Sequence, residues 1–265
     1  MDGPARGVQV ANELGDFLRA RRTDARLEPH TPGTAGRRRI SGLRREEVAT
    51  AAGISVDYYT RLEQGREAHP SDAVIDALVR TLRLGPDARE HLRRLRDAPP
   101  APAPRAADPD LAARMTALVD AVSPRPAYVL DRLSGVVAAN AAGLALYEGF
   151  AELAPDQRNT CRYLLTDPRA PRVFVEWEDL ARGAVAHLRA ANAGDLQDPS
   201  LRALVDELTS ASPRFAEWWG EHIVARRRAA ATHVRTPEGE VVARRFEVLH
   251  LPEDGLRMTL WLDTD

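Results

Sequence analysis

REEVATAAGISVDYYTRLEQ, residues 45–64, is the stretch that decides the fold of the first part of this 265-residue chain. Apolar and small residues recur at helical spacing on both sides of Gly53, which predicts short helices over 43–52 and 55–64. Glycine adopts positive φ at little cost, so Gly53 suits a tight turn between them. Ser55 can cap the second helix by accepting a bond from a free amide. The stretch therefore predicts a helix-turn-helix.

The second helix has an inner and an outer face. Tyr59 and Leu62 face inward, and Ala49 of the first helix is small where the two helices must cross closely. The outward residues are Val56, Asp57, Thr60, Arg61 and Gln64. This arrangement suits insertion of the second helix into a DNA major groove.

The outward side chains are chemically suited to reading DNA. Arg61 and Gln64 can bond base edges, while Ser55 and Thr60 can bond bases or phosphates. Asp57 either accepts a bond from cytosine or orients Arg61. The plainer alternative is an ordinary helical hairpin, because small residues and a glycine turn also occur in simple bundles.

Charge placement favours DNA binding over that alternative. The chain has a net charge of -2, with 37 basic residues, all arginine, against 39 acidic ones. Residues 1–98 carry 18 Arg and 15 acidic residues, whereas 99–265 carry 19 and 24. Between Arg19 and Arg45 there are nine Arg against two acidic residues. A solvated charge run would not explain why this excess stops at the motif. Arg37, Arg38 and Arg39 suit phosphate contacts or a reach into the minor groove, and Arg44 and Arg45 are further candidate DNA contacts.

Further helices are expected around the motif, followed by a linker. Helical periodicity covers 13–24, Ser71 caps another helix, and Pro86 opens a last one. A run rich in proline and alanine follows over 99–109, and proline disfavours helix there. We therefore expect a DNA-binding domain over 1–98, an extended linker over 99–109 and a second domain over 110–265.

The second domain shows a mixed pattern. Strand-like segments at 126–132 and 134–140 precede a helical segment at 141–149. The expected later helices are 171–193, 200–211 and 213–226, and the expected later strands are 229–236, 240–250 and 256–263. Turn sequences join the last three strands as hairpins. This order predicts an α+β domain whose antiparallel sheet carries helices on one face.

Large aromatic side chains are concentrated in this second domain. Such residues can line an apolar ligand pocket, although each can equally be part of an ordinary core. The candidate ligand-binding residues are Tyr128, Tyr147, Tyr163, Phe174, Trp177, Phe215, Trp218 and Trp219. Trp218 and Trp219 are adjacent and cannot both face the same interior of a helix. Asn140 fits a helix cap better than a ligand contact.

Several functional classes are excluded by what the sequence lacks. One cysteine, Cys161, allows no intramolecular disulfide and suits a small core residue. Histidines and acidic residues show no metal-binding spacing, and no catalytic motif or phosphate loop occurs. No apolar run reaches the roughly 18 residues of a membrane span, and residues 1–15 lack a signal peptide's apolar core. We expect a cytoplasmic protein that is not an enzyme, with no cofactor and no metal.

Both domains resemble one known family. The segment RRRISGLRREEVATAAGISVDYYTRLEQGR, residues 37–66, resembles the DNA-binding domain of actinobacterial Xre regulators with an MmyB-like ligand-binding domain. AYVLDRLSGVVAANAAGLALY, residues 127–147, and SPRFAEWWGEH, residues 212–222, resemble the second domain of the same family. The resemblance implies an all-α lambda-repressor-like domain followed by a PAS-like domain with an apolar cavity for fatty-acyl-like ligands. That family tends to carry a His-Pro pair before its Gly-Glu turn, where this chain has Thr236-Pro237, so a role resting on that histidine does not transfer.

Together these features predict a homodimeric regulator that binds double-stranded DNA and senses a small apolar or amphipathic ligand. A dimer is expected because one recognition helix reads only a few base pairs. Three alternatives stay open. The second domain could serve only to dimerise or to bind a protein, or the chain could be an enzyme with a DNA-binding appendage. The second domain could also be a PAS module that binds haem or flavin.

Overall fold

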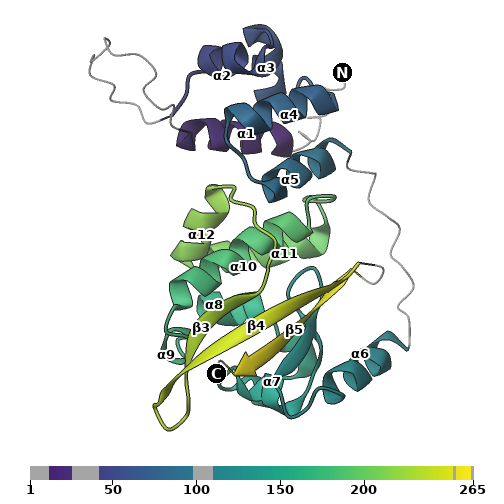
Figure 1. The fold of residues 1–265 in the computed structure, drawn as a ribbon, viewed down its shortest axis with the longest axis vertical. Helices are drawn as coiled ribbons and strands as arrows, with labels where there is room; N and C mark the ends of the chain where they lie inside the picture. The colour runs from purple at the N-terminus through teal and green to yellow at the C-terminus, as the bar shows by residue number, and fades with distance from the viewer. Residues whose placement is uncertain (1–11, 26–41, 98–109, 253–254, 264–265) are drawn as a thin grey trace, which may run out of the picture. The chain divides into compact units, whose positions relative to one another are not determined.

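The computed structural model describes residues 12–25, 42–97, 110–252 and 255–263. The chain divides into two compact units, residues 1–98 and residues 99–265. Figure 1 shows helices alone in the described part of the first unit, and a sheet with helices in the second.

The first unit is built from amphipathic helices. They are α1 (Glu13–Asp24), α2 (Arg45–Ala52), α3 (Val56–Glu63), α4 (Asp72–Thr81) and α5 (Pro86–Arg96). Their apolar faces form a core whose largest fully buried side chains are Phe17, Leu18, Tyr59, Leu62, Ile75, Leu78 and Leu92. The expected helices of this region are confirmed. Helix α2 begins at Arg45 rather than 43, because the extended Arg44 is its N-cap and bonds Glu47 through its amide, 2.7 Å.

A close approach between α1 and α3 fixes how these helices pack. The Asn12 side chain caps α1 by accepting from the Gly15 amide, 3.0 Å, and donates to the carbonyl oxygen of Glu63, 2.7 Å. A Cβ atom at Gly15 would lie 2.5 Å from that carbonyl oxygen. Glycine is therefore required where the first turn of α1 meets the end of α3.

The second unit contains a five-stranded antiparallel sheet, in the order β2-β1-β5-β4-β3. The strands are β1 (Ala127–Leu130), β2 (Val136–Ala139), β3 (Ala230–Arg235), β4 (Val241–Leu251) and β5 (Leu256–Asp263). The longer helices are α6 (Leu111–Asp120), α10 (Trp177–Ala191), α11 (Pro199–Ala211) and α12 (Pro213–Gly220). The short ones are α7 (Ala141–Ala145), η1 (Phe150–Glu152), η2 (Pro155–Gln157), α8 (Thr160–Thr166) and α9 (Ala170–Val173).

Both faces of the sheet are covered, which corrects the expectation of helices on one face. Successive strand residues point to opposite faces. Val129 and Met258 pack against Met115 and Val119 of α6. On the other face, Trp261 packs near Phe174, with ring centroids 6.3 Å apart. The i, i+4 spacing of Met115 and Val119 gives α6 the apolar stripe that it buries.

The strand pattern predicted from the sequence is confirmed, but three predicted helices are shorter or broken. The segment 171–193 splits into α9 and α10, because Phe174 is extended and pairs with Val234 of β3. The segment 213–226 is helical only to Gly220, and His222 has a φ of 51°. The segment 141–149 is helical only to Ala145, and Gly149 has a φ of 85°. Positive φ at His222 and Gly149 prevents either segment from continuing as one right-handed helix through these residues. Periodicity alone did not predict the three breaks.

Candidate nucleic-acid interface and ligand pocket

Helices α2 and α3 form the expected helix-turn-helix. Gly53 follows α2 with a φ of 70°, in the left-handed region, and so turns the chain. The Ser55 hydroxyl accepts a bond from the Tyr58 amide, 3.1 Å, and caps α3 as expected. Ala49 is fully buried, and so are Tyr59 and Leu62. The inner face predicted from the sequence is therefore confirmed.

The outer face of α3 is open to solvent. Val56 is 41% exposed, an unusual position for a branched apolar side chain. Asp57 and Gln64 are also exposed, whereas Thr60 is half-buried and its hydroxyl donates to the Val56 carbonyl, 2.7 Å. An apolar side chain at the start of this helix is suited to contact with a thymine methyl group.

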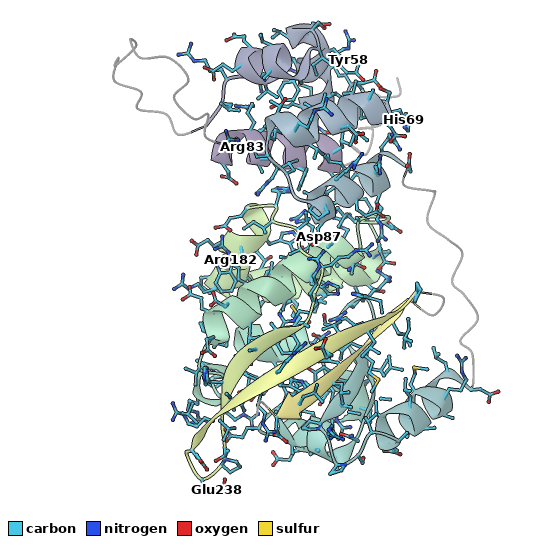
Figure 2. All side chains as sticks on the ribbon, in the orientation of Figure 1. Tyr58, His69, Arg83, Asp87, Arg182 and Glu238 are labelled. Atoms are coloured by element: carbon cyan, nitrogen blue, oxygen red, sulfur yellow. The ribbon has the colours of Figure 1, made fainter. Side chains whose placement is uncertain are left out.

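Arg61 is oriented by its neighbours on α3. Its guanidinium forms an ion pair with the Asp57 carboxylate one turn earlier. The same guanidinium lies 5.7 Å from the ring centroid of Tyr58, whose side chain is labelled in Figure 2. This ion pair is the contact that the second of the two roles considered for Asp57, orienting Arg61, requires. An arginine guanidinium can form a two-pronged hydrogen bond to guanine.

Of the five arginines predicted before α3 to contact DNA, two lie within the described residues. Arg44 is exposed at the N-cap of α2. The Arg45 side chain is 43% exposed, and its Nε donates to the Glu63 carboxylate, 2.7 Å. Arg37, Arg38 and Arg39 lie outside the described residues.

Glu63 is a buried acidic residue that the sequence analysis missed. Its side chain is fully buried and accepts from Nε of Arg22, 2.6 Å, and from Nε of Arg45. Burial alone would raise the pKa of the Glu63 carboxyl, but hydrogen bonds from Arg22 and Arg45 outweigh it and hold the pKa below its ordinary value. Spacing along the sequence could have predicted this burial, since Glu63 lies one helical turn after the inward-facing Tyr59. The carboxylate ties α1, α2 and α3 together and fixes Arg45 beside α3.

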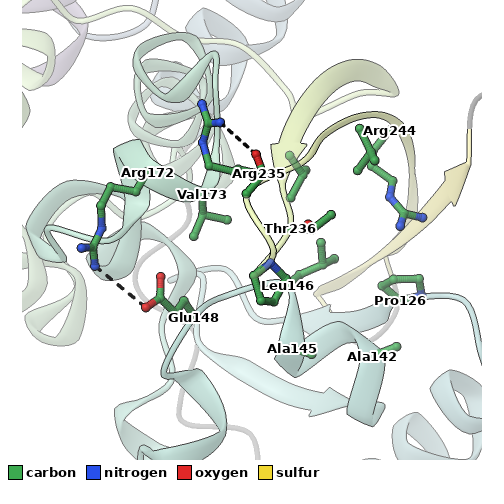
Figure 3. Close-up of a pocket in the computed structure, with 14 residues that line it drawn as sticks. Pro126, Ala142, Ala145, Leu146, Glu148, Arg172, Val173, Arg235, Thr236 and Arg244 are labelled. Carbon is green, nitrogen blue, oxygen red and sulfur yellow. Dashed lines mark hydrogen bonds and ion pairs between the residues drawn. The ribbon is translucent and has the colours of Figure 1, made fainter.

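The second unit contains a pocket of about 570 Å³ at one end of its sheet (Figure 3). Its walls come from the start of β1, from α7 and α9, and from the β3–β4 hairpin. The apolar lining residues are Pro126, Ala142, Ala145, Leu146, Val173, Val234, Pro237 and Val242. A mostly apolar pocket of this volume is large enough for a small organic ligand.

The arginines of this pocket have polar or acidic partners. Arg172 lies 3.9 Å from Glu148, and Arg235 donates to the Gly239 carbonyl, 3.3 Å (Figure 3). Arg244 forms an ion pair with Asp263. The turn that begins with Thr236, where the resembling family tends to have histidine, also lines the pocket.

Four of the eight candidate ligand-binding aromatics form one packed cluster. The Tyr147 ring centroid lies 5.6 Å from that of Tyr128, 5.2 Å from that of Tyr163 and 5.6 Å from that of Phe174. The hydroxyls of Tyr128 and Tyr147 are 2.8 Å apart. All four side chains are buried, and none lines the 570 Å³ pocket. They form the core beneath the sheet in this structure.

The other four candidates lie on or near the helices. Phe215 stacks on Trp219, 5.6 Å between centroids, and the Arg189 guanidinium lies 4.0 Å from the Trp219 ring. Trp177 donates from its indole nitrogen to the Leu164 carbonyl, 2.6 Å. Trp218 lines a smaller pocket of about 290 Å³ with acidic neighbours. The two adjacent tryptophans therefore have different surroundings, as expected.

Two further expectations concern single residues. The Asn140 oxygen accepts from the Gly143 amide, 2.8 Å, which confirms the helix cap. Cys161 is fully buried, and burial raises the pKa of its thiol to about 12, which makes it unreactive. Among the described residues, no three His, Cys, Asp or Glu side chains are grouped to hold a metal ion. In the same part of the chain, no helix is both long and apolar enough to cross a membrane.

Two protein families match the chain. The family described as MmyB-like transcription regulator ligand binding domain matches residues 111–264. The family described as helix-turn-helix domain matches residues 13–92. No curated protein matches the chain.

Proposed function

The chain belongs to the family of the MmyB-like transcription regulator ligand binding domain, and we propose that it reads a specific operator as a homodimer, under the control of a small apolar or amphipathic molecule. Because it also carries a helix-turn-helix domain, the chain is a DNA-binding regulator with a ligand-binding domain. The observation that supports operator recognition is the solvent-exposed outer face of α3, opposite a buried inner face. We also propose that the protein acts in the cytoplasm, because its partner is DNA.

We propose that base recognition rests on the outer face of α3. Arg61, oriented by Asp57, bonds a guanine, and Gln64 bonds a neighbouring base edge. Val56 contacts a thymine methyl group, and Ser55 and Thr60 face the same groove. Phosphate contacts come from Arg44 and Arg45, together with Arg37, Arg38 and Arg39.

Enrichment of DNA from a randomised library tests this assignment directly. The full-length protein should select a defined sequence, and Arg61→Ala should bind that sequence about 10- to 100-fold more weakly. Arg202→Ala is the matched control, because Arg202 is exposed on α11 in the second unit. Selection of no sequence by the wild-type protein would refute specific recognition.

We propose that the pocket between α7, α9 and the β3–β4 hairpin receives the ligand. The apolar lining of this pocket and its volume of about 570 Å³ support the assignment. Coupling to DNA requires that the ligand bind the DNA-competent and incompetent states unequally. The eight aromatic candidates stay a prediction. A ligand would reach Tyr128, Tyr147, Tyr163 and Phe174 only if their packed cluster opened.

The second candidate function is a domain that only dimerises or binds a protein. The close packing of Tyr128, Tyr147, Tyr163 and Phe174 favours it, because these rings fill the interior in this structure. Ala145→Trp distinguishes the two, since Ala145 is exposed and lines the pocket. In a thermal-shift screen of apolar compounds, wild-type stabilisation that Ala145→Trp abolishes supports a ligand pocket. Absence of any stabilisation supports the second candidate.

A further inference from the structure

Exposed apolar side chains are concentrated in the second unit. Among the described residues of the first unit, the large apolar side chain that is exposed is Val56, on the face of α3 assigned above to DNA. The corresponding residues of the second unit are Leu118, Val175, Val241 and Leu249. Val241 and Leu249 both lie on β4 and are 46% and 50% exposed. The second unit is therefore better suited than the first to hold two copies of the chain together.

Val241 and Leu249 belong to the outer face of the sheet, which is the face that carries α6. Leu249 pairs with Met258 of β5, which packs against α6. Successive residues of a strand point to opposite faces, so every second residue of β4 shares this outer face. Phe246 points to the other face and packs against Trp261, with ring centroids 5.0 Å apart. The outer-face residues of β4 are Val241, Ala243, Arg245, Glu247, Leu249 and Leu251.

Helix α6 leaves this part of the outer face open. It packs mainly on β1 and β2, whereas β4 lies two places further along the sheet than β1 (Figure 1). The neighbouring strand β5 adds the half-buried Leu260 and Leu262 to the same face, beside Glu247 and Arg245 of β4. A contiguous apolar surface of this kind is typical of a protein contact site.

The order of side chains along β4 makes this face complementary to a second copy of itself. Along the strand, the outer face reads apolar, apolar, basic, acidic, apolar, apolar. Reversing the strand exchanges the basic and acidic positions and leaves every apolar position apolar. A two-fold axis that crosses β4 at Phe246 therefore places Arg245 opposite Glu247 of the partner subunit. The same axis places Leu249 opposite Ala243 of the partner subunit.

The two central charges favour this arrangement over a parallel one. Arg245 forms an ion pair with Glu247 of its own strand, and its side chain is still 58% exposed. With the two β4 strands antiparallel, each guanidinium has carboxylates on both sides. With the strands parallel and related by a two-fold axis, Arg245 would face Arg245 of the partner subunit, and like charges repel.

We propose that the outer face of β4 and β5 is the dimerisation surface of this protein, where two copies pack with their β4 strands antiparallel. This inference rests on the homodimer proposed above. The Arg245–Glu247 pairs of the two copies form a cluster of four alternating charges at the centre of the surface. Leu249, Leu260 and Leu262 supply the apolar contacts around it.

This surface also lies next to the proposed ligand pocket. Val242 and Arg244 are on the opposite face of β4 and line that pocket. A ligand in the pocket therefore contacts the same strand that joins the two copies.

Reversing the central charges tests the proposal, by sedimentation velocity of the full-length protein. Arg245→Glu leaves only acidic residues at the centre, and Glu247→Arg leaves only basic ones. Each variant alone should dimerise about 100-fold or more weakly than wild type, because like charges then face each other. An equimolar mixture of the two variants should dimerise again, since each basic pair then lies opposite an acidic pair. Recovery in the mixture also shows that both variants are folded.

A matched control and the wild-type protein separate this surface from the homodimer itself. Arg202→Glu makes the same charge change at an exposed position on α11 and should leave the dimer intact. A monomeric wild type would refute the homodimer. A wild-type dimer that persists in both single variants would overturn only this surface, and would leave the face to another protein or another segment of the chain. Variants that stay monomeric when mixed would overturn the antiparallel pairing.

Discussion

Glu63 shows how one buried charge organises the DNA-binding unit. It is fully buried between Arg22 and Arg45, and its carbonyl oxygen also accepts from Asn12. Glu63→Gln leaves two arginines without their counter-charge, so the unit should lose about 3 kcal/mol of unfolding free energy. Hydrogen exchange of peptides from α1 and α3 measures this loss. Glu46→Gln, at an exposed position on α2, should have no such effect.

The pH dependence of stability provides a second readout of the same residue. The folded-state pKa of Glu63 is depressed, so its stabilising contribution is complete above the unfolded value of about 4.3 and is lost as pH falls through the lower folded value. Wild-type stability should therefore drop more steeply below about pH 4 than that of Glu63→Gln. Parallel acid profiles for the two proteins would contradict this account.

Loss of the Arg44 side chain should affect DNA binding differently from loss of the Arg61 side chain. Its side chain is exposed at the N-cap of α2, where it suits a phosphate contact. Arg44→Ala should weaken binding to all DNA sequences alike and reduce the slope of log affinity against log salt by about one unit. Fluorescence anisotropy at several salt concentrations measures the slope. An unchanged slope would place Arg44 outside the interface.

At the scale of elements, the turn between α2 and α3 depends on the backbone of Gly53. Its φ is 70°, and a Cβ atom there would meet nothing within 4 Å, so substitution costs backbone strain alone. Gly53→Ser should lower the unfolding free energy by about 1 kcal/mol. Gly85→Ser is the matched control, because Gly85 caps α5 with a φ of -74° and serine is favoured there. Equal stability of the two variants in chemical denaturation would contradict the role of the turn.

The same elements show what the sequence could predict. The helix-turn-helix follows from local signals, namely apolar spacing, Gly53 and the Ser55 cap. The β3–β4 and β4–β5 hairpins follow from turn residues and alternation. The break at Phe174 did not follow, because it depends on pairing with Val234, sixty positions later in the chain. Only one of the eight proposed ligand aromatics, Trp218, lines a described pocket, because the pocket walls come from segments that only the fold brings together.

At the scale of the whole molecule, the near-neutral charge conceals two different halves. The acidic excess lies in 99–265, and the arginine-rich stretch between Arg19 and Arg45 precedes the recognition helix. This division assigns DNA binding to the first unit and leaves the second to bind ligands.

A homodimer makes a geometric prediction about the operator. Light scattering should give twice the 29.1 kDa mass of one chain. The selected DNA should contain two inverted half-sites with centres about 10 base pairs apart, or a multiple of that, so that both recognition helices reach one face of the duplex. A monomer that selects a single half-site would contradict the proposed assembly.

The central claim is that Arg61 reads a base. The measurement that tests it most directly is competition anisotropy with wild type and Arg61→Ala, each on the selected operator and on operators with one guanine replaced. For wild type, replacing the guanine that Arg61 contacts should cost about 1–3 kcal/mol. For Arg61→Ala, the same replacement should cost almost nothing, while other replacements keep their wild-type cost. Equal sensitivity of both proteins at every guanine would contradict the claim that Arg61 reads a base.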